Sequence, residues 1–410
     1  MGVNDNPFEF HESDCYVACV GENGGTDNFD IREGFKSSVN IMINAVENGE
    51  YEDTLIYPVV YNARHSLELS MKIVLEYLIY ISNFRKVPFT EQDKRRIYTH
   101  DITVLDSMIQ KYYLFDNRIV ETYDKVRPYL KDYYFDKKGD VFKYESDHSG
   151  NPHLIKLGIS AISYDVLKRK YNEMMEYFDS LIFEVMYLCR EYGMGTFTKH
   201  LSRKDIQDIA KILPPREHWK DAVFAEKKDL IKKKYKIGSK EFSDTMNIIQ
   251  KHMEFCVYLG MEQKLGNIPE NELRKYARLV MEMNGDDLYK VSKTKVEQIN
   301  VTEISLTQIH RKTAKRLELS KDISDGMLIW LMVFRQYGNS MELFTERAEI
   351  IHEQFEKMNF QRHDTLRKVE KREVFRKILL GMRRCGQVTY HEIIKSEFEN
   401  SGKELIEYEL

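Results

Sequence analysis

An apolar helical repeat between residues 59 and 81 constrains the fold more strongly than any other feature of this sequence. Its apolar residues recur every three or four positions and would share one face of a long helix. They are Val60, Ala63, Leu67, Met71, Val74 and Leu78. Ionisable residues, among them Arg64, His65, Glu68 and Lys72, interrupt the same stretch. We therefore expect a core helix in which Leu67 and Met71 are buried, whereas Glu68 lies on a charged edge outside the core.

Residues that break helices are scarce, because the 410 residues include only 8 prolines and 20 glycines. Few interruptions favour long helices, and the alternating apolar pattern of strands is rare after about residue 30. Two short stretches, residues 8–25 and 140–151, alternate well enough for β-hairpins and contain glycine turns. The sequence thus predicts an all-α fold with short β-hairpins.

Two breaks divide the chain, one at YGMGTFTKHLS near residue 195 and one at LGNIPENE near residue 265. Glycine and proline in both stretches are typical of connections between domains. We expect three regions, namely residues 1–195, 196–265 and 266–410. The last region is expected to be helical throughout, with helices over residues 323–337, 340–358 and 365–384.

Charge and cysteine content narrow the class of protein. The net charge is −4, so no overall positive field attracts nucleic acids and any such site must be local. The 5 cysteines form no C-x-x-C pair, which argues against a zinc site or a disulfide framework and favours a reducing compartment. No secretory signal is recognisable, and the longest apolar run, residues 326–334, is about half of a membrane span. We expect a cytoplasmic protein without a membrane segment.

Two short motifs occur in the N-terminal half, E-x-x-x-K-x-x-L and, further along the chain, T-H-D-x-x-x-L. Their residues are Glu68, Lys72 and Leu75, then Thr99, His100, Asp101 and Leu105. These two motifs resemble the signature of HEPN domains. The resemblance covers roughly residues 30–190 and implies an up-and-down bundle of four helices, joined here to a helical C-terminal region that it does not cover. HEPN domains belong to prokaryotic defence and toxin–antitoxin systems.

The resemblance also implies a chemistry. Catalytic HEPN domains are metal-independent ribonucleases that use an arginine followed, four to six residues later, by a histidine on a late helix. On the helix expected after residue 164, no arginine has a histidine at that distance. The spacing does occur at Arg95–His100 and at Arg347–His352. Chance alone gives about two such pairs in a chain of this composition, so the spacing by itself carries no information.

The candidate catalytic residues are Arg64, His65 and His100, with Arg347 and His352 as a weaker pair. A histidine can remove the proton of a ribose 2′-hydroxyl, while an arginine stabilises charge on the phosphorane-like transition state. Glu68, Lys72 and Asp101 would form a polar ladder around them. The order of the two motifs predicts that His100 and Asp101 lie beside Glu68 or Lys72, with Asp101 as the N-cap of the helix that begins there. A structural explanation stays open, in which i,i+4 ion pairs contribute about 0.2–0.5 kcal/mol each and His100 fixes a loop across the bundle.

A second candidate surface lies near the C-terminus, where residues 362–384 contain nine Lys/Arg and three Asp/Glu. Apolar residues within this stretch would pack it onto the body and leave a basic face that could follow nucleic-acid phosphates. The candidate nucleic-acid-binding residues are Arg372, Arg376, Lys377 and Arg383. The alternative is a solvated face balanced by the acidic C-terminal tail.

Two functions from different classes fit these features. The first is an anti-phage defence component that acts on or senses RNA or nucleotides, with metal-independent ribonuclease activity as its catalytic form. The second is a non-catalytic interaction module for a partner protein encoded nearby. Members of the resembled family pair their bundles, so a homodimer is expected. No phosphate-binding glycine loop, H-E-x-x-H, G-x-S-x-G or carboxylate cluster occurs, so neither a metal nor a cofactor is expected.

Overall fold

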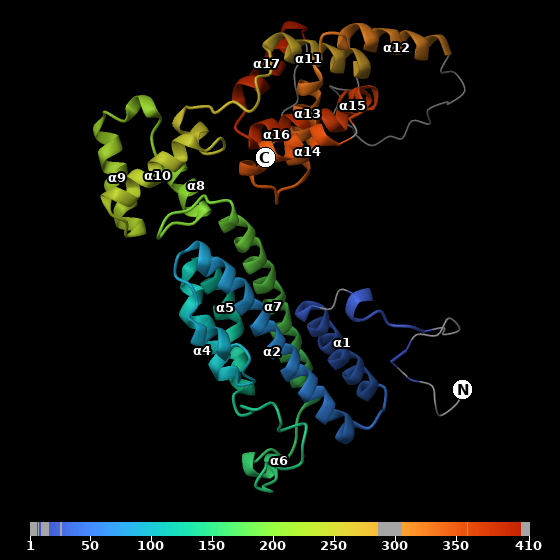
Figure 1. Cartoon of the computed structure of the whole chain (residues 1–410), viewed down its shortest axis with the longest axis vertical. Coiled ribbons are helices and arrows are strands. Elements are labelled where there is room, and N and C mark those ends of the chain that lie inside the picture. Colours follow the sequence, from blue (N-terminus) through green and yellow to red (C-terminus); the bar gives the residue numbers. More distant parts are fainter. Residues whose placement is uncertain are drawn as a thin grey trace. The chain divides into compact units, whose positions relative to one another are not determined.

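The structure, a computed structural model, describes residues 6, 8–9, 16–24, 27–285, 306–358 and 360–402, with the backbone alone at 306–309. These residues are mostly helical, which confirms the expected all-α class (Figure 1). Contacts within the chain divide it into two units, Met1–Gly195 and Thr196–Leu410. No helix among the described residues combines the length and the apolar character that crossing a membrane requires.

The first unit is built around two long helices, α2 (Glu52–Phe84) and α7 (Tyr164–Gly193), which lie side by side (Figure 1). The helices α1 (Asn28–Glu47) and α4 (Ile102–Tyr112) pack on α2, and α5 (Asn117–Leu130) packs on α7. Two short helices lie in the connections, α3 (Glu91–Arg96) and α6 (His153–Leu157).

The apolar repeat of α2 forms the centre of this core. Leu67 and Met71 are fully buried, as the helical spacing predicted. The expectation for Glu68 was wrong, because this carboxylate is only 1 % exposed. Helix α2 also begins earlier than expected, at Glu52, so that Pro58 lies inside the helix. Packing on three neighbouring helices buries more of the α2 surface than one apolar stripe covers.

The expected β-hairpins are not confirmed. Residues 140–151 form turns, closed by one isolated bridge between Ser146 and Pro152. The Asp147 carboxylate accepts hydrogen bonds from the backbone N–H groups of Ser149 and Asn151, at 2.9 and 3.0 Å. This side chain therefore satisfies backbone donors that a strand ladder would otherwise use. The other expected hairpin lies partly outside the described residues, and its described part contains a 3-10 helix, Gly21–Asn23.

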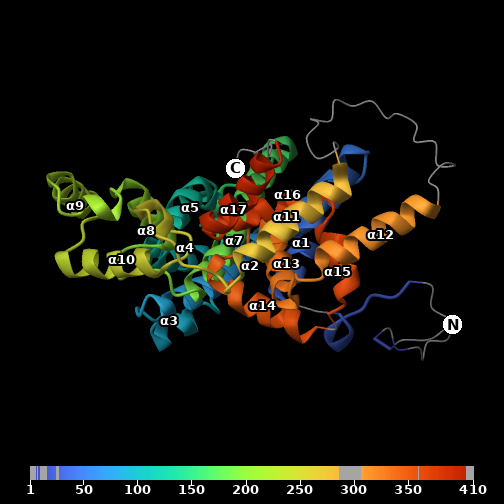
Figure 2. The same ribbon diagram turned by 90° about the horizontal axis from the view of Figure 1, so that it is seen from above.

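The second unit contains two hydrophobic cores. One is enclosed by α8 (Arg203–Ile212), α9 (Ala222–Tyr235) and α10 (Ser239–Lys251). The other is enclosed by the helices that follow, which lie apart from α8–α10 in Figure 2. These are α11 (Glu270–Asn284), α12 (Leu306–Ser320), α13 (Asp325–Asn339), α14 (Ala348–Lys357), α15 (Arg362–Val369), α16 (Arg372–Arg384) and α17 (Val388–Asn400).

Two glycines allow α13 and α16 to cross in close contact. A Cβ atom on Gly338 would lie 1.9 Å from the backbone oxygen of Lys377, and one on Gly381 would lie 1.8 Å from that of Phe334. No side chain fits in either place. The apolar run that is too short for a membrane span is thus the buried part of α13, packed directly against the α16 backbone.

Two expected helices differ from the structure, one by a later start and one by a break, and both differences have tertiary causes. After α13 the chain turns, because Arg384 donates hydrogen bonds to the carbonyls of Tyr337 and Ser340, and α14 begins only at Ala348. The expected helix over 365–384 is divided into α15 and α16 at Glu370. The Glu370 carboxylate accepts two hydrogen bonds from Arg316, which fixes the break.

Candidate functional site

Arg64 of α2 lies at the centre of a buried polar network in the first unit. Its side chain is 4% exposed, and its guanidinium donates to acceptors from three parts of the chain. Nη1 donates to Glu68 at 3.0 Å, Nη2 donates to the carbonyls of His100 and Asp136, and Nε faces the Asp136 carboxylate at 3.1 Å. Arg64 therefore joins α2, the start of α4 and the loop after η3 (Lys131–Tyr133).

The Glu68 carboxylate is the second centre of this network. It accepts hydrogen bonds from Arg64, from Lys72 Nζ at 2.7 Å, and it lies 3.0 Å from His100 Nδ1. Burial opposes ionisation of Glu68, but the hydrogen bond and charge of Lys72, with contributions from His100 and Arg64, lower the pKa of Glu68 below its usual value. Glu68 is thus a buried carboxylate that three cationic or polar side chains keep ionised.

His100 is placed beside Glu68, as the order of the two motifs predicted. Its side chain is 63% exposed although its partner is buried. A carboxylate can only accept a hydrogen bond, so the neutral imidazole carries its proton on Nδ1 and leaves Nε2 as an acceptor. The next residue, Asp101, is the N-cap of α4 and accepts from the N–H of Thr103 at 2.9 Å, as expected.

Sequence reasoning missed Asp136 and Gly139, which complete the network. The Asp136 carboxylate is 3% exposed and accepts from the N–H groups of Gly139 and Asp140, at 2.8 and 3.1 Å. Gly139 has φ +71°, and a Cβ there would lie 2.7 Å from Arg64 Nη1. The Asp-Lys-Lys-Gly-Asp stretch is a recognisable turn signal, but nothing in it indicates that the turn faces Arg64.

His65 does not join this network. Its ring contacts Phe35 of α1 edge-on, at 4.4 Å between centroids, and lies parallel to the ring of Tyr61 at 6.0 Å. Burial lowers the pKa of His65 below its usual value, and the opposing effect of Glu68 does not compensate. His65 is therefore a largely neutral residue of the α1–α2 interface, rather than a group that meets a substrate.

This lowered pKa predicts a pH dependence of stability. Below about pH 6.5 the unfolded chain takes up a proton at His65 that the folded chain resists, so the contribution of His65 is complete above that pH and is lost as the pH falls. We expect the urea midpoint to fall between about pH 7.5 and about pH 5.5, and to fall less in His65→Gln. An equal fall in both proteins would contradict the assignment.

Cationic residues surround the exposed edge of the Arg64 network. Lys137 and Lys138 lie in the loop that Arg64 holds, are exposed, and form no ion pair with a described residue. Arg95 and Arg96 are exposed at the end of α3, shortly before His100. Tyr98, which lies between Arg96 and His100, is 82% exposed. We call the residues 95–100, together with Lys137 and Lys138, the loop surface.

The weaker pair, Arg347 and His352, is not brought into a common site. Arg347 is exposed at the N-cap of α14, whereas His352 stacks on Trp330 of α13 at 4.4 Å between ring centroids. His352 Nε2 is buried and makes no hydrogen bond with a described residue. The five-residue spacing places the two side chains on different faces of the turn. His352 therefore serves packing against Trp330, and the pair does not form a catalytic site.

The basic C-terminal segment is less exposed than expected. Within α16, Lys377 and Arg383 are exposed, but Arg372 and Arg376 are half-buried, and Arg376 pairs with Glu373 at 3.1 Å. The packing of α16 against α13 occupies much of its surface. Only two of the four candidate cations are thus exposed, which is a weaker surface for a phosphate backbone than four.

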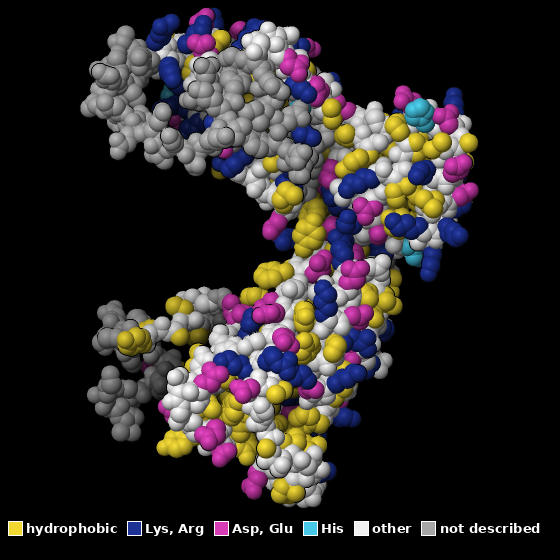
Figure 3. Space-filling model, turned by 180° about the vertical axis from the view of Figure 1, so that it is seen from behind, with side chains coloured by type: hydrophobic (Ala, Val, Ile, Leu, Met, Phe, Trp, Pro, Cys, Tyr) yellow, Lys and Arg dark blue, Asp and Glu magenta, His cyan; other side chains and the backbone are white. Residues whose placement is uncertain are grey.

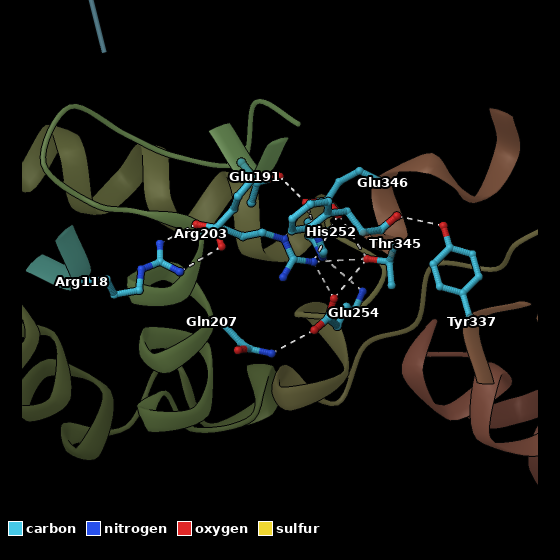
Figure 4. A network of polar contacts seen from close by, with 11 residues as sticks. Arg118, Glu191, Arg203, Gln207, His252, Glu254, Tyr337, Thr345 and Glu346 are labelled. Atoms are coloured by element: carbon cyan, nitrogen blue, oxygen red, sulfur yellow. Dashed lines mark hydrogen bonds and ion pairs between the residues drawn. The ribbon is translucent and has the colours of Figure 1, made fainter. Parts of the chain in front are cut away.

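A further polar network, unrecognised from the sequence, lies in the second unit (Figure 4). Arg203 of α8 contacts Glu254 at 2.6 Å and Glu346 at 2.9 Å, and His252 lies 3.0 Å from Glu346. Burial alone would raise the pKa of Glu346, but the close approach of His252 and the hydrogen bonds and charge of Arg203 lower it far below its usual range. Thr345 also donates to Glu254. The arrangement joins α8 to the segment before α14, a structural role.

No group of three or more metal-ligating side chains lies close together in the described part of the chain. Comparison of the sequence with models of protein families and with curated proteins, and of the structure with solved structures, found no match in any of the three. Evidence for function therefore comes from the geometry of the site.

Proposed function

We propose that the first unit is a HEPN-like module that binds the sugar–phosphate backbone of RNA at the loop surface, with His100 as its proton-transfer group. One observation carries this proposal. An exposed imidazole is fixed through Nδ1 by a buried, ionised carboxylate, and the arginine that holds this carboxylate also holds the loop of Lys137 and Lys138. The folding of α2 thus brings a titratable group and two free cations to one surface.

Charge distribution supports a local site rather than a broad one. On the face shown in Figure 3, basic and acidic side chains are interspersed over the described surface, in agreement with the net charge of −4. Binding to phosphates therefore has to depend on a few cations that no carboxylate neutralises. Lys137 and Lys138 meet this condition. The exposed ring of Tyr98 offers a surface on which an unpaired base can stack.

The proposed chemistry is cleavage by transesterification without a metal. His100 Nε2 accepts the proton of a ribose 2′-hydroxyl, and the 2′ oxygen attacks the adjacent phosphorus. The bond to the 5′ oxygen breaks, this oxygen takes a proton from water, and the imidazolium returns its proton to the hydroxide that remains. The products are a 2′,3′-cyclic phosphate and a 5′-hydroxyl. Glu68 stabilises the imidazolium that forms, in the way that an orienting carboxylate does elsewhere. Arg64 acts as a positioning residue, because its donors are engaged inside the protein.

The test is incubation of the purified chain with total RNA in the presence of a chelator. We expect cleavage that persists with chelator and falls by about 10²-fold or more in His100→Gln, because general acid–base catalysis contributes about 10²–10⁴-fold. The exposed position of His100 means that this variant should keep its thermal midpoint. His218→Gln is the matched control, since His218 is also exposed and paired with a carboxylate but lies in the second unit.

A charge variant separates binding from chemistry. Replacing Lys137 and Lys138 with glutamine should weaken RNA binding for all sequences and reduce its salt dependence, without changing the pH profile of cleavage. Cleavage that His100→Gln leaves unchanged would refute the catalytic role. Binding that the double glutamine variant leaves unchanged would refute the loop surface as the RNA site.

The second candidate function, a non-catalytic interaction module, is favoured by a different observation. All the polar groups around Arg64 are engaged with one another, as in a structural network, and α7 carries no arginine followed by a histidine at the required spacing. RNA binding without cleavage, or co-purification with the product of a neighbouring gene, would support this function over the enzyme.

A role in defence and a homodimeric state are also proposals that rest on the resemblance. Loss of protection against phage in His100→Gln would support the first. For the second, the first unit exposes large apolar side chains on two helices in contact, Ile41 of α1 at 67% and Phe183 of α7 at 63%. Light scattering that reports a monomer at micromolar concentration would contradict the homodimer.

A further inference from the structure

The first unit contains a cavity of about 390 Å³ that the proposed function does not use. It lies between η3, the segment that leads into α7, and the facing turns of α2 and α7. Its volume is within the range of roughly 300–1,000 Å³ that small-molecule sites occupy. Most of its wall is apolar, formed by Val60, Phe135, Phe142, Ile162, Leu167 and Met174.

One polar group in this wall has no partner. Tyr133 is 8% exposed and lines the cavity, yet its hydroxyl forms no hydrogen bond with a described residue. Other buried tyrosines of this chain are satisfied: Tyr123 donates to Asp106 at 2.7 Å, and Tyr171 lies 2.8 Å from the Ser66 hydroxyl. Because no described residue pairs with the Tyr133 hydroxyl, this hydroxyl can donate to or accept from a group that binds in the cavity.

The charged residues of the cavity are neutralised at its rim. Lys170 of α7 is paired with Asp132, and both side chains are partly exposed. Burial raises the pKa of the Tyr133 hydroxyl far above its usual value, so this group stays neutral and can donate or accept. A charged ligand would therefore lose its hydration without gaining a free countercharge, whereas a neutral ligand would not.

We infer that this cavity binds a neutral aromatic molecule with one hydrogen-bonding group, of the phenol or indole class. The ring of the ligand fills the apolar wall, and its hydroxyl or N–H pairs with Tyr133. The inference rests on the cavity and on Tyr133 alone, and it is independent of RNA binding and of His100.

The test uses two probes of similar shape, 4-methylphenol and toluene, and ligand-observed NMR on the full chain. We expect the wild type to bind 4-methylphenol more tightly than toluene. Tyr133→Phe should weaken 4-methylphenol binding by roughly 10-fold and leave toluene binding unchanged, because one hydrogen bond is lost while the ring stays in place. Tyr51→Phe is the matched control, since Tyr51 is exposed and does not line the cavity.

A second variant keeps the inference open to refutation. Ile162→Trp places a larger side chain in the cavity wall, and it should abolish binding of both probes while His100-dependent RNA cleavage continues. Binding of neither probe to the wild type would overturn the inference. Equal binding of 4-methylphenol to the wild type and to Tyr133→Phe would overturn it as well.

Discussion

Arg64→Ala is expected to destabilise the first unit by about 3–5 kcal/mol, a large fraction of the unfolding free energy of a typical domain. The substitution leaves the Glu68 carboxylate with fewer donors and the Asp136 carboxylate without its arginine, in a site where both side chains are at most 3% exposed. It also releases the carbonyls of His100 and Asp136 from their common donor. Uncompensated buried charge is one of the largest costs that a single substitution can produce.

Urea unfolding followed by far-ultraviolet circular dichroism measures this loss. Arg96→Ala is the matched control, because Arg96 is exposed and its removal should change stability by less than about 0.5 kcal/mol. Both tryptophans of the chain, Trp219 and Trp330, lie in the second unit, so their fluorescence reports the unfolding of that unit. An Arg64→Ala midpoint equal to that of the control would show that the network is not the structural centre of the bundle.

This expectation changes how a loss of activity in Arg64→Ala is interpreted. From the sequence, Arg64 is a candidate to touch the substrate. In the structure it holds two loops in place, so its removal should abolish RNA binding and cleavage together with folding. His100→Gln is the informative variant for chemistry, because His100 is exposed. When the imidazole is removed, Glu68 still accepts hydrogen bonds from Arg64 and Lys72.

Gly381→Ala is expected to have the second large effect, a loss of about 3 kcal/mol or more, at the upper end of the range for overpacked cores. The added methyl group would lie 1.8 Å from the backbone oxygen of Phe334. A side chain can change its rotamer, but a helix backbone can yield only if α13 and α16 move apart. Separation of these helices would loosen the largest core of the second unit.

Gly326→Ala is the control: it makes the same Gly→Ala change, but its expected effect on stability has the opposite sign. Gly326 also lies in α13, but a Cβ there has no atom within 4 Å. Alanine in an exposed helical position is more favourable than glycine by up to about 1 kcal/mol. Tryptophan fluorescence during urea unfolding should therefore show a lower midpoint for Gly381→Ala and an unchanged or higher one for Gly326→Ala. Equal midpoints would mean that α13 and α16 do not cross at these glycines.

Some contacts of the candidate site could be predicted from the sequence. The i,i+4 spacing of Arg64, Glu68 and Lys72 predicted their ion pairs, because helix geometry alone brings such residues together. The order of the two motifs predicted the contact between Glu68 and His100. The burial of Glu68 could not be predicted, because it depends on the packing of three neighbouring helices on α2.

The local pattern of this chain determined its helical class, the core face of α2 and the N-cap of α4, since these depend on residues within a few turns of one another. Tertiary structure alone decided the rest. Asp136 reaches Arg64 across 72 positions, and Arg316 ends α15 across 54. Contacts of such sequence separation are set by the packing of whole helices, which no short pattern records. For that reason the sequence showed which residues carry charge, and only the fold showed which of them are buried.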